Sequence, residues 1–106
     1  MLDLVEGDLP TVDLIFCRDC LVHFSARLAM KAIGNIKRSR SKYLLTTTFP
    51  RQATNDTIVT GNWRPVNLSA APFNFPPPML LIDEKNPPPH EDKSMGMWRV
   101  DDLPTC

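Results

Sequence analysis

The sequence predicts an α/β domain built on a strand–helix–strand unit in the first half of its 106 residues. Three observations predict it: an apolar run at 12–17 that ends in a polar cluster, a helical pattern after Ser25, and a second run at 42–49 rich in aromatic and β-branched residues. A helix that joins two short strands forms a crossover connection. We therefore expect the two strands to be parallel, with a right-handed crossover.

The composition is that of one small globular domain. Hydrophobic residues make up 42% of the chain and charged residues 23%, and Lys+Arg equals Asp+Glu at 12 each. This balance argues against generic nucleic-acid binding. No apolar run approaches the roughly 18 residues of a membrane span, and the acidic N-terminus does not resemble a signal peptide. We expect a cytoplasmic protein with neither nucleic-acid nor membrane partners.

The first strand is expected at Val12 to Cys17, a short apolar segment of the kind that is buried on both faces of a parallel sheet. Ser25 is a good N-cap for the helix that follows. One face of this helix is apolar and carries Leu28, Ala29, Ala32, Ile33 and Ile36. The other face is polar and carries Arg27, Lys31, Asn35 and Arg38. The second strand is expected at Lys42 to Phe49, and Pro50 ends it.

The second half of the chain is richer in proline and less regular in pattern, because most of the 11 prolines lie after Pro50. Residues 51–78 show little periodicity, and a loop of this length in a compact domain is usually functional or disordered. A third strand is expected at Met79 to Glu84 and a fourth at Gly96 to Val100, antiparallel to the third. Residues 79–106 are therefore expected to form a C-terminal β-hairpin.

Two segments carry a resemblance to a known family. Residues 13–25 read Asp-Leu-Ile-Phe-Cys-Arg-Asp-Cys-Leu-Val-His-Phe-Ser, and residues 41–50 read Ser-Lys-Tyr-Leu-Leu-Thr-Thr-Thr-Phe-Pro. They resemble the fourth strand with its turn, and the fifth strand, of class I S-adenosylmethionine-dependent methyltransferases. Segments 61–68, 72–78 and 93–100 resemble a poorly characterised bacterial branch of that superfamily. The resemblance implies a partial Rossmann-like methyltransferase sheet, comprising strands four to seven of a seven-stranded fold.

A methyltransferase domain usually begins with a Gly-rich turn near the methionine part of the cofactor and an acid that binds the ribose. This chain has four glycines, at 7, 34, 61 and 96, and no Gly-rich turn. We therefore expect residues 1–106 to be one partial domain that is inactive alone, and whose family transfers a methyl group to a small-molecule or protein acceptor. The alternative is a non-catalytic interaction or dimerisation module, or a truncated gene product, which self-associates through the exposed edge of its first strand.

The resemblance assigns cofactor binding to Asp3, Cys17 and Arg18. Asp3 lies where an acid of related enzymes sits near the adenine amino group of S-adenosylmethionine. Cys17 and Arg18 come at the carboxyl end of the first strand, where ligands collect in α/β sheets. The alternative for Arg18 and Asp19 is a solvated turn in which the two side chains pair with each other.

The substrate side of the same cleft is assigned to Thr48 and Phe49, at the end of the second strand, and to Trp63 and Arg64. An aromatic–cation pair such as Trp63–Arg64 can clamp a planar or anionic substrate. The alternative for all four residues is the packing of an irregular segment.

The sequence fixes no catalytic residue, and the weak candidates are Asp19 and His23. A histidine side chain can act as a general base, so His23 is a candidate, but its position well past the strand end favours a structural role. Methyl transfer from a sulfonium needs mainly alignment and the exclusion of water, so a catalytic triad is not expected.

The spacing Cys17-x-x-Cys20 raises the question of a metal or redox site. Structural zinc needs four ligands, and no second Cys/His pair follows. Redox Cys-x-x-Cys pairs usually lie at a helix N-terminus, whereas Cys17 ends a strand. The odd total of three cysteines shows no disulfide framework, so we expect reduced thiols and no metal.

Overall fold

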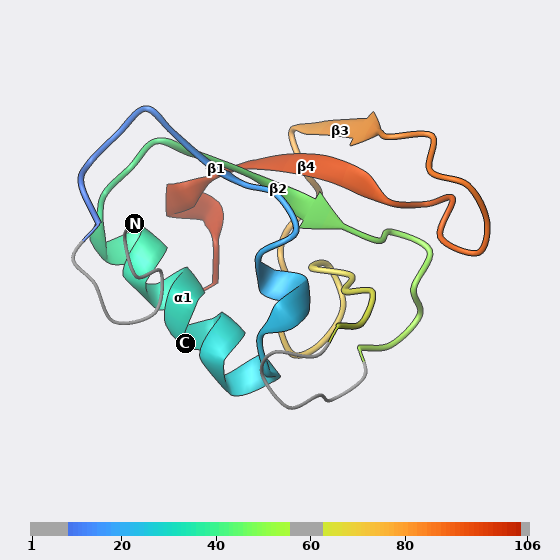
Figure 1. Ribbon diagram of the computed structural model, residues 1–106. Coiled ribbons are helices and arrows are strands. Elements are labelled where there is room, and N and C mark those ends of the chain that lie inside the picture. The colour runs from blue at the N-terminus through green and yellow to red at the C-terminus, as the bar shows by residue number, and fades with distance from the viewer. Residues whose placement is uncertain (1–8, 56–62, 105–106) are drawn as a thin grey trace.

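The computed structural model describes residues 9–55 and 63–104, which form a small α/β domain with a four-stranded mixed sheet. The elements follow the expected order. They are β1 (Leu14–Cys17), the 3₁₀ helix η1 (Leu21–His23), α1 (Ala26–Arg38), β2 (Tyr43–Thr48), β3 (Leu80–Asp83), β4 (Ser94–Arg99) and the 3₁₀ helix η2 (Val100–Asp102). Figure 1 shows the strands as one layer, with α1 below it.

The strand order in the sheet is β1-β2-β4-β3. β1 and β2 are parallel, as expected for two strands joined through a helix. β4 runs antiparallel to both of its neighbours, so the expected β3–β4 hairpin is confirmed. The fourth strand begins two residues earlier than expected, at Ser94, because that residue is paired with both Thr48 and Asp83.

Helix α1 covers one face of the sheet. The Ser25 hydroxyl accepts a hydrogen bond from the Leu28 amide at 3.3 Å, so Ser25 is the predicted N-cap. The residues that α1 buries include Ala29, Ala32, Ile33 and Ile36. The placement of Asn35 on the polar face was wrong. This residue borders the apolar stripe one turn after Ala32, and it is buried, with its side-chain oxygen accepting a hydrogen bond from Arg38.

The described part of the irregular segment, from residue 63 to β3, covers the rest of the same face (Figure 1). Its buried apolar side chains belong to the hydrophobic core and are Val66, Leu68, Phe73 and Phe75. Trp98 of β4 lies edge-on to Phe75, with ring centroids 5.1 Å apart, and its Nε1 donates to the Pro76 carbonyl at 2.6 Å. A proline-rich segment thus takes the place that a helix often has on an α/β sheet.

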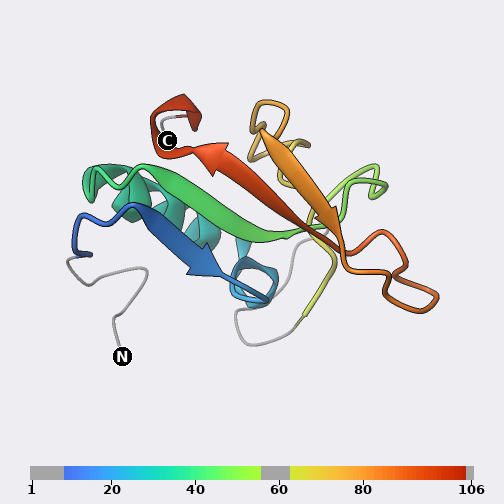
Figure 2. The ribbon, with the colours of Figure 1, turned by 90° about the horizontal axis from the view of Figure 1, so that it is seen from above.

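The opposite face of the sheet is apolar and has no helix on it among the described residues (Figure 2). Backbone register places Phe16, Leu45, Met97 and Leu80 in one row across all four strands. The expectation that β1 is buried on both faces was therefore wrong, since the Phe16 side chain is 62% exposed. We call this surface the open face, and it comprises Leu14, Phe16, Leu45, Leu80, Ile82 and Met97.

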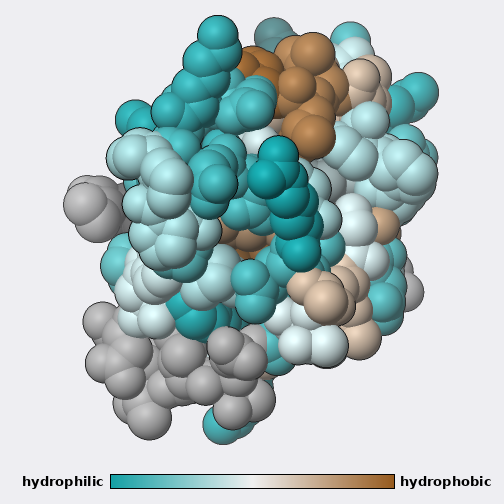
Figure 3. All heavy atoms as spheres, turned by 90° about the vertical axis from the view of Figure 1, so that its right-hand side faces the viewer, coloured by the Kyte–Doolittle hydropathy of each residue, from teal (hydrophilic) through white to brown (hydrophobic). Residues whose placement is uncertain are grey.

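Exposed apolar side chains extend along β3 at the far end of the sheet from β1. Met79, Leu80, Leu81 and Ile82 each expose about half of their surface. Figure 3, which looks at the molecule from the β3 side, shows apolar side chains gathered at the top of that view. Exposed apolar area of this extent on a sheet commonly marks a surface that another polypeptide covers.

Candidate functional site

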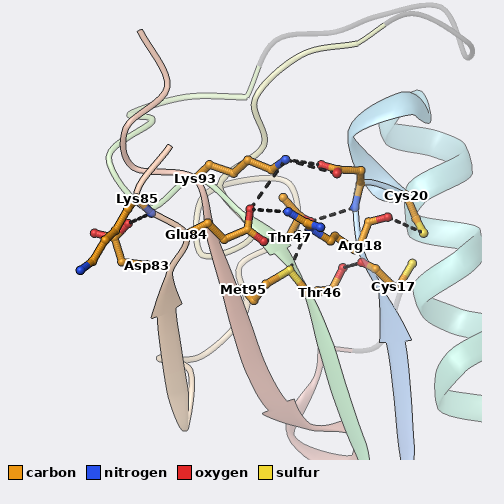
Figure 4. A network of polar contacts seen from close by, with 11 residues as sticks. Cys17, Arg18, Cys20, Thr46, Thr47, Asp83, Glu84, Lys85, Lys93 and Met95 are labelled. Atoms are coloured by element: carbon orange, nitrogen blue, oxygen red, sulfur yellow. Dashed lines mark hydrogen bonds and ion pairs between the residues drawn. The ribbon is translucent and has the colours of Figure 1, made fainter. Parts of the chain in front are cut away.

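The termini of all four strands lie next to one another along the edge of the sheet that runs across the strands, at the carboxyl ends of β1 and β2. β1 and β2 both end there because they are parallel, β3 ends there, and β4 begins there. The residues that follow or precede these strand ends are polar, and Figure 4 shows many of them pointing toward one another. We call this group the polar edge, and its members are Arg18, Asp19, Thr47, Glu84 and Lys93.

Ion pairs hold the polar edge together across the width of the sheet. The Arg18 guanidinium binds both oxygens of Glu84, at 3.1 and 3.3 Å. The Lys93 ammonium lies 2.9 Å from Asp19 Oδ1 and 3.8 Å from Glu84 Oε2. Arg18 and Asp19 are thus each paired with a residue of the β3–β4 connection. The hydrogen bond that Arg18 donates to Glu84 raises the pKa of Arg18 above its ordinary value, but the Arg18 side chain is 54% exposed, so solvent screens the pair.

Two threonines of β2 fix the turn that follows β1. The Thr46 hydroxyl donates to the Cys17 carbonyl at 2.8 Å. The Asp19 amide donates to the Thr47 hydroxyl at 2.8 Å. Asp19 has a φ of 56°, in the left-handed region that Asp and Asn tolerate better than most residues. The turn between Cys17 and Cys20 is therefore held in one conformation by side chains of the neighbouring strand.

The two cysteines that flank this turn lie in different environments. Cys17 is buried and Cys20 is half-buried, and both are free thiols. A hydrogen bond between the two side chains raises the pKa of Cys17, and burial adds to that rise. The same hydrogen bond lowers the pKa of Cys20 to about 7, against the opposing effects of burial and of the Asp19 charge. In its protonated form the Cys20 thiol donates to the Arg18 carbonyl at 3.4 Å.

An aromatic cluster lies near the end of β2 and consists of Phe49, Trp63 and His90. The ring centroids of Trp63 and His90 are 4.9 Å apart, and both rings are edge-on to Phe49. Phe49 is buried, whereas Trp63 is 42% exposed. Two predicted substrate-side residues, Phe49 and Trp63, thus come together, and His90 joins them from the β3–β4 connection.

The remaining predicted substrate-side residues have packing contacts. Arg64 is buried, and its Nη1 donates to the main-chain carbonyls of Leu21 and Val22 at 3.2 and 3.0 Å. Arg64 therefore ties the irregular segment to η1. Thr48 is buried too, and its hydroxyl accepts a hydrogen bond from the Leu68 amide at 3.1 Å.

The weak catalytic candidates have different surroundings in the structure. Asp19 belongs to the polar edge and pairs with Lys93. His23 is exposed at the end of η1, where its amide donates to the Cys20 carbonyl at 3.2 Å. Asp3, the third predicted cofactor-binding residue, lies outside the described residues.

Sequence reasoning missed Glu84, Lys93 and His90. The only signal for the first two is that opposite charges flank the polar connection between β3 and β4. Arg18 pairs with Glu84 across 66 positions of the sequence, and Asp19 pairs with Lys93 across 74 positions. Local sequence patterns do not encode such distant pairings.

Within residues 9–55 and 63–104, no group of three or more His, Cys, Asp or Glu side chains is placed to hold a metal ion. In the same part of the chain, no helix is long and apolar enough to cross a membrane. No protein-family model matches the chain, and neither a curated protein nor a solved structure matches it. Function is therefore inferred from the topology of the sheet and from the polar edge.

Proposed function

We propose that this chain is the C-terminal half of a class I S-adenosylmethionine-dependent methyltransferase domain, and that it is inactive alone. The observation that supports the proposal is the parallel pair β1–β2, joined through α1 and followed by the antiparallel pair β3–β4. This arrangement is the one that the resemblance of residues 13–25 and 41–50 implies for strands four to seven.

The open face supports the same proposal. Parallel strand pairs in α/β proteins are usually covered by helices on both faces. Here β1 and β2 are parallel, yet Leu14 and Phe16 of β1 are exposed. In the proposed complete domain, a further parallel strand pairs with the edge of β1, and helices of the missing half cover the open face.

The residues at the end of β1 fit one wall of a cofactor site. Cys17 and Arg18 come at the carboxyl end of a parallel strand, and the hydroxyl of Thr46 holds the Cys17 carbonyl in place. Within the described residues the glycines are Gly34 in α1 and Gly96 in β4, so neither forms a Gly-rich turn after a strand. In this proposal, the part of the cofactor site nearest the methionine group is formed by the N-terminal half of the domain, which would carry the Gly-rich turn.

Bound S-adenosylmethionine supplies the methyl group, which it carries on a sulfonium. The task of this chain in the reaction is then to position the cofactor and to keep water out. Hydrogen bonds to and from the β2 threonines hold the turn after β1, and the aromatic cluster offers an apolar surface on the side where the acceptor is expected. The acceptor is a small molecule or a protein.

Calorimetric titration with S-adenosylmethionine tests the proposal. The isolated chain is compared with a longer form, in which upstream coding sequence or a partner polypeptide supplies a Gly-rich turn and a strand-ending acid. We expect no saturable heat with the isolated chain and one-site binding with the longer form. A longer form that binds no cofactor contradicts the proposal.

The second candidate function is a non-catalytic interaction or dimerisation module, favoured by the exposure of Phe16 and of the β3 apolar residues. Sedimentation velocity distinguishes the two. A concentration-independent dimer of the isolated chain, together with a longer form that does not bind S-adenosylmethionine, favours the interaction module.

A further inference from the structure

We propose that Cys17 and Cys20 form a redox-active dithiol, which a low-molecular-mass disulfide such as oxidised glutathione converts to an intramolecular disulfide. The structure holds both residues as free thiols at the polar edge. This proposal does not depend on methyl transfer, because it rests on the turn after β1 and on the chemistry of the two thiols.

The backbone geometry suits a disulfide. Arg18 and Asp19 are the two central residues of a turn that begins at Cys17 and ends at Cys20. The first and last Cα atoms of such a turn lie within about 7 Å of each other. A disulfide needs Cα atoms about 4.4–6.8 Å apart, so the turn brings the two residues into the required range.

The side chains meet as well. Figure 4 shows both sulfur atoms on the same side of the turn, and the interaction between the two thiols raises the pKa of Cys17. Thr46 and the Asp19 amide contacts hold the turn in place, so the pair is arranged before any oxidant arrives. The sequence argument against redox chemistry was the lack of a helix N-terminus at Cys17. Here the neighbouring thiol of Cys17, in place of a helix N-terminus, lowers the pKa of Cys20.

The two thiols have different roles because their environments differ. Cys20 is half-buried, and the hydrogen bond from Cys17 lowers its pKa to about 7, so a larger fraction of it is thiolate at pH 7 than of an ordinary cysteine. A thiol of ordinary pKa, near 8.5, is only about 3% thiolate at that pH. Cys17 is buried, and its pKa is raised. Cys20 is therefore the attacking residue and Cys17 the resolving one.

The reaction proceeds through a mixed disulfide. The Cys20 thiolate attacks one sulfur of oxidised glutathione, the glutathione S–S bond breaks, and one glutathione leaves as a thiolate. Cys17 then gives its proton to that thiolate and attacks the Cys20 sulfur, which releases a second glutathione. Overall, two protein thiols lose two electrons and two protons, and one oxidised glutathione becomes two reduced molecules.

Formation of the disulfide constrains the turn that contains Arg18 and Asp19, two residues of the polar edge. Arg18 and Asp19 lie between the bonded cysteines, and they hold Glu84 and Lys93. Oxidation of Cys17 and Cys20 is therefore expected to change the conformational freedom of the β3–β4 connection as well as that of the turn.

Exposure of the full chain to oxidised glutathione at pH 7 tests the proposal. The background carries Cys106→Ser, which leaves Cys17 and Cys20 as the only thiols. Remaining thiols are alkylated, and the peptide that contains residues 17–20 is analysed by mass spectrometry. We expect an internal disulfide in that peptide and its reversal by excess reduced glutathione. Full alkylation of both thiols, or a glutathione adduct that never resolves, overturns the proposal.

Two further measurements separate the roles of the thiols. The variant Cys17→Ser is expected to keep a stable glutathione adduct on Cys20, whereas Cys20→Ser is expected to form none. Because serine at a buried position can disturb folding, the alkylation rate of Cys20 is also followed against pH in the unmodified chain, with Cys106 as the internal reference. We expect half-maximal alkylation of Cys20 near pH 7, and a midpoint at or above that of Cys106 contradicts the assignment of Cys20 as the attacking thiol.

Discussion

Replacement of Gly96 with alanine is expected to destabilise the domain, because the position has no room for a methyl group. A Cβ at Gly96 lies 2.5 and 2.7 Å from two ring atoms of Trp98 and 3.4 Å from Thr48 Cγ2. The ring cannot move aside at low cost. Trp98 is buried, its Nε1 is bonded to the Pro76 carbonyl, and its ring is packed against Phe75.

The expected loss is that of an overpacked core, about 1–3 kcal/mol in the free energy of unfolding. For a chain of this size, each kcal/mol corresponds to a fall of about 4–8 °C in Tm. Gly34→Ala makes the same chemical change where space exists, since the nearest atom to its Cβ is Arg38 Nη1 at 3.5 Å. Alanine is the better residue within a helix, so Gly34→Ala is expected to stabilise the chain by about 0.5–1 kcal/mol.

Urea unfolding followed by tryptophan fluorescence measures both effects. The midpoint is expected to fall for Gly96→Ala and to rise for Gly34→Ala, with the denaturant dependence unchanged in both variants. A Gly96→Ala variant with a midpoint at or above that of the parent chain refutes the placement of the Trp98 ring over Gly96.

Three other variants test separate parts of the structure. Arg64→Met is expected to lower the free energy of unfolding by about 2–3 kcal/mol, because two buried carbonyls of η1 lose a charged donor; an unchanged urea midpoint argues against this role. Lys93→Met is expected to cost up to about 1 kcal/mol at low salt and less in 1 M salt, since ion pairs of the polar edge are screened; a salt-independent loss in thermal unfolding points to packing instead. Phe16→Ser is expected to leave the urea midpoint nearly unchanged and to reduce any self-association of the isolated chain in sedimentation velocity, because this side chain is mostly exposed; a large loss of stability indicates that Phe16 belongs to the core.

The local elements of the fold could be predicted from the sequence, because their signals are local. The N-cap Ser25 and the apolar stripe of α1 lie within a few residues of the structure that they specify. The insertion of β4 between β2 and β3 could not be predicted in this way. Strand order depends on pairings between distant segments, and a strand with one apolar face can satisfy several arrangements.

The candidate site was predictable only in part, for the same reason. The rule that ligands collect at strand ends led to Cys17, Arg18 and Asp19, which do lie at one edge of the sheet. Their partners Glu84 and Lys93 come from the other end of the chain. For Arg64 the structure agrees with the packing alternative, because its buried guanidinium donates to two main-chain carbonyls of η1.

The proposal that the end of β1 contacts the cofactor can be tested by photolabelling. The longer form is irradiated with S-adenosylmethionine that carries a radioactive methyl group. Ultraviolet irradiation attaches the bound cofactor to residues that touch it, and peptide mapping then locates the label. We expect label in the peptide of residues 12–25, which contains the end of β1 and the turn with Cys17 and Arg18. Label confined to the preceding segment, with none in residues 12–25, contradicts the claim that this chain forms a wall of the cofactor site.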